Sequence, residues 1–185
     1  MSLFAFSGRK WSGNLKLTAS IAVALLVILS AINIMLVSDE APRGIISFQF
    51  AATPERATGV VQSWQRSDMG ASGSGVEWAQ ASLYLDFAFV AAYLLLLLKL
   101  TGHWLIDRPG VREQQLGRWA RGLFWTGALT DVAENICLLV TLEQAQSAFW
   151  PLVATLFALV KFSSLLAGAA ALLILRAARG QPLAT

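Results

Sequence analysis

Three polar residues interrupt an apolar stretch that is long enough to cross a membrane. The stretch runs from Leu123 to Leu142, and Asp131, Glu134 and Asn135 lie near its middle. Residues at positions i, i+3 and i+4 share one face of a helix. Because an ionised side chain in hydrocarbon costs at least about 2.5 kcal/mol, we expect this face to point into a helix bundle or a wet cavity. Carboxyl groups in such a place can bind a ligand, transfer protons or hold helices together.

The other apolar stretches add further polar residues. Lys161 interrupts the last stretch, Asp86 interrupts the second, and Asn33 lies in the first. Tyr93 follows Asp86 by seven residues and Ser164 follows Lys161 by three, so each shares a helix face with the charged residue before it. With a rise of about 1.5 Å per residue, antiparallel helices bring all of these residues into the outer half and middle of the membrane. We therefore predict that they meet.

Three carboxyl groups accompany one amine in this predicted cluster. We expect at least one carboxyl to stay protonated, or the cluster to recruit water or another cation, with titration shared by the group. In a structural interpretation, Lys161 bridges Asp131 or Asp86 and the network fixes the register of the helices. In a functional interpretation, the cluster lines an outward-opening pocket. Both interpretations remain open from the sequence.

The apolar stretches offer few groups for metal or cofactor chemistry. The membrane stretches contain no histidine and no pair of cysteines, so the sequence predicts no zinc or other metal site. A Schiff base on Lys161 is chemically allowed, but four helices form a small cage for a retinal-like cofactor. No cofactor is identified by the sequence.

The composition is that of an integral membrane protein. Of the 185 residues, 56% are hydrophobic and 14% are charged, and the mean hydropathy is +0.61. The net charge of +3 comes from basic residues that flank apolar stretches, so it indicates a membrane surface and not nucleic acid. The single cysteine, Cys137, excludes an intrachain disulfide and the thiol-oxidising enzymes built on four helices.

Four stretches, at about 17–37, 79–101, 120–142 and 150–175, are long enough to cross a bilayer. We predict an all-α integral membrane protein, an antiparallel bundle of four transmembrane helices that forms one domain over residues 1–185. A cleaved signal peptide is the alternative for the first stretch. It exceeds the usual apolar core of about 7–15 residues and lacks a convincing small-X-small site, so we expect it to be retained.

Residues 38–78 form the largest segment predicted outside the membrane. Residues 44–50 alternate in polarity, which predicts a short extended segment. Thr53 and Pro54 predict the start of an amphipathic helix. We expect that helix to lie on the membrane surface, or else to pack on top of the bundle. The glycine-rich residues 70–75 predict a flexible link to the second span.

The two remaining connections differ in length. Residues 99–121 form a polar connector with a short helix predicted near Pro109, and residues 143–149 form a tight turn. The distribution of lysine and arginine predicts the orientation, because ten of the fourteen lie in the N-terminal segment, the 99–121 connector and the C-terminal segment. By the positive-inside rule, we expect the cytoplasmic (inner) membrane, with both termini cytoplasmic and residues 38–78 facing outward.

A short stretch resembles a known family. Residues 130–136, Thr-Asp-Val-Ala-Glu-Asn-Ile, resemble the Asn-Asp-X-Glu-Asn-Ile stretch of the membrane-associated eicosanoid and glutathione metabolism family, whose members also have four spans. The resemblance would imply glutathione binding. Here, however, the stretch lies in the third span instead of the second, Thr130 replaces the first asparagine, and Thr126 stands where that family has arginine. We therefore assign no family.

Three functions fit these features. The first is binding of a lipid-like amphiphile, or service as a subunit of a membrane complex. The second is an intramembrane enzyme for a lipid-like substrate, with Asp86, Asp131 or Glu134 as acid or base and Lys161 as electrostatic partner. The third is a small proton-coupled carrier. The expected partners are membrane lipids and either a second copy or another membrane subunit, with no nucleic acid.

Overall fold

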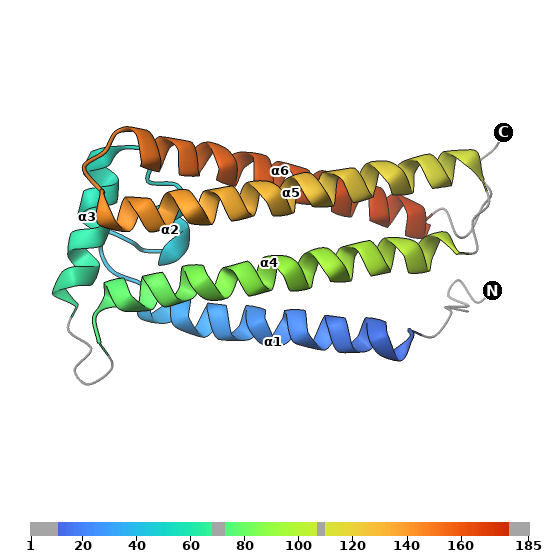
Figure 1. Cartoon of the computed structure of the whole chain (residues 1–185), viewed down its shortest axis with the longest axis horizontal. Coiled ribbons are helices and arrows are strands. Elements are labelled where there is room, and N and C mark those ends of the chain that lie inside the picture. Colours follow the sequence, from blue (N-terminus) through green and yellow to red (C-terminus); the bar gives the residue numbers. More distant parts are fainter. Residues whose placement is uncertain (1–10, 68–72, 107–109, 178–185) are drawn as a thin grey trace, which may run out of the picture.

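The protein is built from helices alone in the residues described. The computed structural model describes residues 11–67, 73–106 and 110–177. Four long helices, each apolar enough to cross a membrane, run antiparallel to their neighbours (Figure 1). The predicted four-span, all-α fold is confirmed. The described helices are α1 (Gly13–Met35), α2 (Ile45–Gln49), α3 (Pro54–Arg66), α4 (Gly75–Leu105), α5 (Val111–Glu143) and α6 (Phe149–Ala177).

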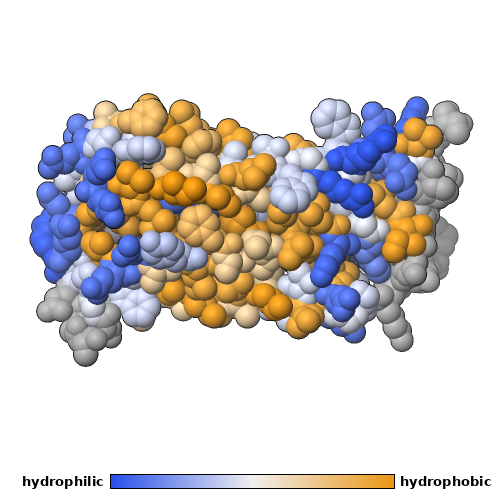
Figure 2. All heavy atoms as spheres, viewed as in Figure 1, coloured by the Kyte–Doolittle hydropathy of each residue, from blue (hydrophilic) through white to orange (hydrophobic). Residues whose placement is uncertain are grey.

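The two ends of the bundle differ in what they carry. At one end α1 and α5 begin while α4 and α6 finish. We call this the basic end because it carries Lys16, Lys99, Arg112, Arg118, Arg121 and Arg176. At the other end, α2 and α3 lie across the long helices (Figure 1), and we call residues 45–66 the cap. Between hydrophilic ends the surface is mostly apolar (Figure 2), as expected for a multi-pass membrane protein.

The long helices form an open arrangement. Helix α1 packs mainly along α4, α4 along α5, and α5 along α6, while α4 and α6 touch only locally. Helix α1 buries only Leu15, Thr18 and Ala22. Lys99 of α4 strengthens this outer contact by donating a 2.7 Å hydrogen bond to the Thr18 hydroxyl. Most of the apolar surface of α1 is therefore left for lipid.

Helix α3 turns its apolar face toward the bundle. Its N-cap is Thr53, as predicted, with Pro54 at the first helical position. Trp64 is buried, meets Phe48 edge to face at 5.3 Å between ring centroids, and donates a 2.8 Å hydrogen bond to the Leu36 carbonyl. Leu83 of α4 belongs to the same apolar core. The amphipathic helix is confirmed, but it packs on the bundle and its apolar face does not turn toward lipid.

The residues predicted to be extended are helical instead. Ile45–Gln49 form α2, preceded by Gly44 with a φ of +59°. A Cβ at Gly44 would overlap Asn33, whose side-chain oxygen accepts a 2.8 Å hydrogen bond from the Ile45 amide. Phe48 and Gln49 are both buried, which the alternation did not indicate. Adjacent residues of an extended segment point to opposite sides, so the burial of both Phe48 and Gln49 against the bundle favours a helical turn here.

The helices on both sides of the polar connector are longer than predicted. Helix α4 continues to Leu105, and α5 runs unbroken from Val111 to Glu143. The short helix expected near Pro109 is thus the beginning of α5. At Gly117, within α5, the Leu105 side chain packs into the space where a Cβ would lie. The tight turn before Phe149 is confirmed, whereas residues 70–72 of the predicted flexible link lie outside the described residues.

Candidate functional site

Six polar residues of the second, third and fourth membrane stretches meet where α4, α5 and α6 pack together. Glu134 and Asn135 have no exposed surface, and Asp131 and Lys161 are each 4% exposed. Asp86 is only partly buried. We use the name central polar cluster for Asp86, Tyr93, Asp131, Glu134, Asn135 and Lys161.

The Lys161 amine lies between two carboxylates of α5. Its Nζ atom is 2.6 Å from Glu134 Oε2 and 3.1 Å from Asp131 Oδ1. Asp131 and Glu134 are three residues apart, so one amine can reach both from the facing helix. The Phe162 ring lies on a further side of the amine, with its centroid 4.7 Å away. Lys161 therefore joins α6 to α5 at a buried position.

Two hydrogen bonds join α4 to the same face of α5. The Tyr93 hydroxyl donates to Asp131 Oδ2 at 2.9 Å, and Asn135 Nδ2 donates to Asp86 Oδ2 at 2.7 Å. Because the helices are antiparallel, the later residue of α4 pairs with the earlier residue of α5. The two bonds together set the register of α4 against α5.

Small residues let α5 and α6 approach closely enough for these contacts. A Cβ at Gly127 would lie 2.8 Å from the Leu165 side chain and 3.6 Å from the Lys161 carbonyl oxygen. Ala154 and Ala158 of α6 are completely buried. Small residues at such positions are typical of packed membrane helices. The close approach of the α5 and α6 backbones thus brings the Lys161 amine to the carboxylates of α5.

The central polar cluster is short of hydrogen-bond donors. Glu134 Oε1 and Asn135 Oδ1 are buried and have no hydrogen-bond partner among the described residues. Glu134 Oε2 also lacks a well-directed hydrogen bond, although it is in ion-pair contact with Lys161. If every carboxyl were ionised, three negative charges would face one positive charge. A buried acceptor without a hydrogen bond is uncommon and lowers stability. We therefore expect a donor that is not part of the described residues to bind these atoms.

Two predicted site residues stay outside this network. Asn33 bonds to the chain that leads into the cap, because its amide nitrogen donates to the Arg43 carbonyl at 3.3 Å and its oxygen accepts from Ile45. Ser164 is buried on the same face of α6 as Lys161, but within the described residues no hydrogen bond joins it to the cluster. The alternative in which Lys161 bridges Asp86 is also not what the structure shows, since Glu134 takes that place.

One residue was missed by the sequence analysis. The Thr155 hydroxyl donates to the Gln49 carbonyl at 2.9 Å and accepts from the Ala52 amide at 3.2 Å. It lies six residues before Lys161 and fixes the cap to α6. Its only signal in the sequence was a hydroxyl in an apolar stretch, which more often bonds to its own helix.

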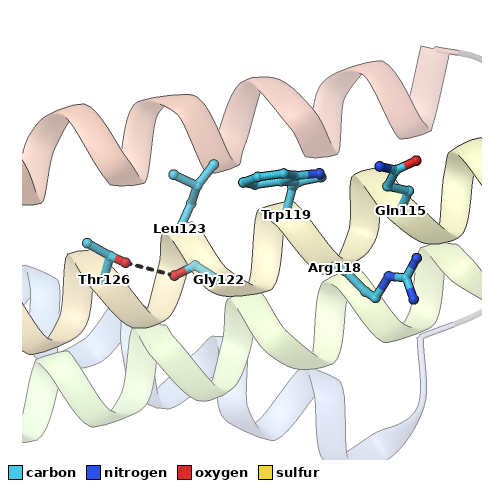
Figure 3. Close-up of a pocket in the computed structure, with 6 residues that line it drawn as sticks. All are labelled: Gln115, Arg118, Trp119, Gly122, Leu123 and Thr126. Carbon is cyan, nitrogen blue, oxygen red and sulfur yellow. Dashed lines mark hydrogen bonds between the residues drawn. The ribbon is translucent and has the colours of Figure 1, made fainter.

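Two surface hollows lie elsewhere on the helices, and neither of them is the predicted outward-opening pocket. A hollow of about 220 Å³ near the cap lies between α4 and α5, and one of about 460 Å³ lies on α5 near the basic end (Figure 3). Neither is lined by a residue of the central polar cluster. Within the described residues, no group of three histidine, cysteine or acidic side chains is arranged to hold a metal ion.

Comparisons with protein-family models, with curated protein sequences and with solved structures find no match to this chain. The function is therefore argued from the geometry of the cluster.

Proposed function

We propose that this multi-pass membrane protein binds the polar head of a lipid-like amphiphile at the central polar cluster. The observation that supports the proposal is the pair of buried acceptors without partners, Glu134 Oε1 and Asn135 Oδ1. A bound head group that donates N–H or O–H hydrogen bonds would satisfy both atoms. We place the protein in the cytoplasmic membrane with both termini inside, on the distribution of basic residues.

The charges define the class of head group. The cluster holds three carboxyl groups and one amine, so a head group with positive charge restores the balance while an anionic one is repelled. A primary ammonium group supplies both the positive charge and the hydrogen-bond donors that the cluster lacks, because it has three N–H donors. The partly exposed Asp86 is the charged member of the cluster that an incoming amine reaches first. A neighbouring membrane subunit that inserts a lysine would use the same chemistry.

A proton-coupled carrier is the second candidate. A proton on Glu134 Oε1 would remove one excess charge and turn an unpaired acceptor into a donor. Exchange of that proton with water through Asp86 would link the cluster to a pH gradient. Neither of the two surface hollows adjoins the carboxyl groups, so a head group or an enzyme's substrate would reach them only if the helices moved apart at the partly exposed Asp86.

Binding can be tested with a long-chain primary amine as the probe. The full-length protein is purified in a mild detergent, and retention of hexadecylamine is measured by native mass spectrometry against palmitate and hexadecanol. We expect hexadecylamine to be retained and Glu134→Gln to abolish its retention, because the variant removes one charge and supplies its own donor.

Glu143→Gln is the matched control, since Glu143 ends the same helix outside the cluster. Equal retention of amine by both variants would refute the binding proposal. Proton uptake in vesicles that depends on a pH gradient and disappears in Glu134→Gln, without any retained amine, would support the carrier instead.

A further inference from the structure

A second feature lies on the outer face of α5 near the basic end. A hollow of about 460 Å³ lies there, and all of its lining residues come from this helix (Figure 3). Its lining residues are mostly exposed and repeat at helical spacing, so they form a stripe along the helix. We call this hollow the α5 groove; its residues are Gln115, Arg118, Trp119, Gly122, Leu123 and Thr126.

Gly122 forms the floor of the α5 groove. A Cβ at this position would meet nothing within 4 Å, so the space above the backbone is open. Trp119 and Arg118 lie on opposite sides of it toward the beginning of α5, and Thr126 lies on the other side of Gly122 along the helix (Figure 3). The Thr126 hydroxyl donates to the Gly122 carbonyl at 3.1 Å, so it offers an apolar methyl group to an occupant. The groove can therefore receive an extended apolar chain.

The end of the groove nearest the beginning of α5 is polar. The exposed Arg118 forms no ion pair within the described residues, and the indole nitrogen of Trp119 is turned toward Gln115 (Figure 3). A guanidinium group, an amide and an indole N–H all donate hydrogen bonds, and arginine pairs well with phosphate. The position also suits the membrane boundary, because Arg176 packs 5.6 Å from the centre of the Trp104 ring at this same end. Positive charge and donors thus meet at the level of lipid head groups.

We propose that the α5 groove holds one anionic phospholipid, with its phosphate on Arg118 and Gln115 and one acyl chain over Gly122 toward Thr126. A second copy of the protein is a poorer occupant, because a two-fold contact through the groove would bring the two copies of Arg118 together. Charge complementarity favours the lipid. The site is separate from the central polar cluster, which attracts the opposite charge.

The test compares retained lipids in variants of the full-length protein. The protein is reconstituted with equal amounts of phosphatidylglycerol and phosphatidylcholine, released in mild detergent, and examined by native mass spectrometry. We expect one phosphatidylglycerol to be retained preferentially. Arg118→Gln should lower that preference about fivefold, the effect of one basic residue near an anionic membrane. Gly122→Leu should abolish retention, because leucine fills the floor of the groove.

Arg121→Gln is the matched control. Arg121 is also exposed on α5, but it reaches toward Gly102 of α4 and does not line the groove. The proposal is overturned if Arg121→Gln lowers the preference as much as Arg118→Gln, since general attraction to anionic lipid would then explain both. It is also overturned if Gly122→Leu, shown to be folded by its melting curve, still retains the lipid. A lipid-free dimer that Gly122→Leu disrupts would instead identify the groove as a contact between copies.

Discussion

Lys161 is the residue on which the central polar cluster depends most. Its amine compensates Asp131 and Glu134 at once, and both carboxylates are buried. Removing one partner of a buried ion pair is far more costly than replacing the whole pair, because the remaining charge has no compensation. The cluster therefore specifies how α5 and α6 fit together, whether or not a ligand also binds there.

Lys161→Met tests this dependence. We expect the variant to lower the free energy of unfolding by about 3–5 kcal/mol, since two buried carboxyl groups lose their cation. The measurement is equilibrium unfolding of the full-length protein in mixed micelles. Lys99→Met is the control, because Lys99 is exposed and its loss should cost about 1 kcal/mol or less. Equal effects of the two substitutions would contradict a structural role for the buried amine.

The two tyrosines of the chain provide a second comparison. Tyr93 donates to Asp131, whereas Tyr84 on the same helix is 59% exposed. Tyr93→Phe should lower the free energy of unfolding by about 1–3 kcal/mol, because it leaves a buried acceptor without its donor. Tyr84→Phe should leave stability unchanged. Both variants are measured by the same unfolding assay in micelles. If Tyr93→Phe left the free energy of unfolding unchanged, the hydrogen bond to Asp131 would not contribute to stability.

The sequence predicted which residues belong to the cluster better than it predicted which of them pair with one another. Counting the rise along each helix predicted that Asp131 and Lys161 meet, and they are in contact. Depth does not determine the direction in which a side chain points around its helix. For that reason the predicted structural bridge from Lys161 went to Asp131 or Asp86, whereas Asp131 and Glu134 hold its amine, and Asn33 was assigned to a cluster that its side chain does not enter.

At the scale of the elements, close packing of α5 on α6 is the main requirement of the site. A Cβ at Gly168 would lie 2.8 Å from one atom of the Phe124 ring and even closer to another. Gly168→Ala should therefore lower the free energy of unfolding by about 1–3 kcal/mol through overpacking. Gly122→Ala is the control on an open face of α5 and should be neutral, or stabilising by up to about 1 kcal/mol.

The free energies of unfolding of these two variants are measured in micelles, with circular dichroism as the readout. If Gly168→Ala were as stable as Gly122→Ala, the helices would have to separate easily, and the contact between Lys161 and the carboxyl groups would not depend on small residues.

The sequence predicted the long helices better than the segments between them. Long apolar stretches can satisfy their backbone polar groups in lipid only as helices, so four spans followed directly. Residues 44–50 were too short for their period to distinguish a helical turn from an extended segment, and burial of both Phe48 and Gln49 favoured the helix. The amphipathic pattern of α3 shows that one face is apolar. It does not show whether that face packs on the bundle or on lipid.

At the scale of the whole molecule, the open arrangement of the long helices could not be predicted. Lipid is as apolar as leucine, so there is little hydrophobic drive for α1 to cover a second neighbour. Helix α1 packs mainly along α4 and exposes most of its length. Two specific hydrogen bonds add to this packing, Lys99–Thr18 at the basic end and Trp64–Leu36 at the cap, just after the end of α1.

The proposed orientation can be tested by labelling single cysteines. In a Cys137→Ser background, Ser12→Cys lies at the basic end and Gln62→Cys on the exposed side of α3. We expect a membrane-impermeant maleimide to label Gln62→Cys in intact cells and Ser12→Cys only after permeabilisation, as the positive-inside rule requires. The reverse pattern would mean that the cap faces the cytoplasm.

The brief turn between α5 and α6 has a consequence for biosynthesis. Helix α5 is the least apolar of the four spans, and its buried Asp131 and Glu134 have no cation within their own helix turn. Only five residues separate its end from the beginning of α6, which brings Lys161. We expect the translocon to release these two segments into the bilayer as a paired hairpin, with the charges already neutralised, and not one after the other.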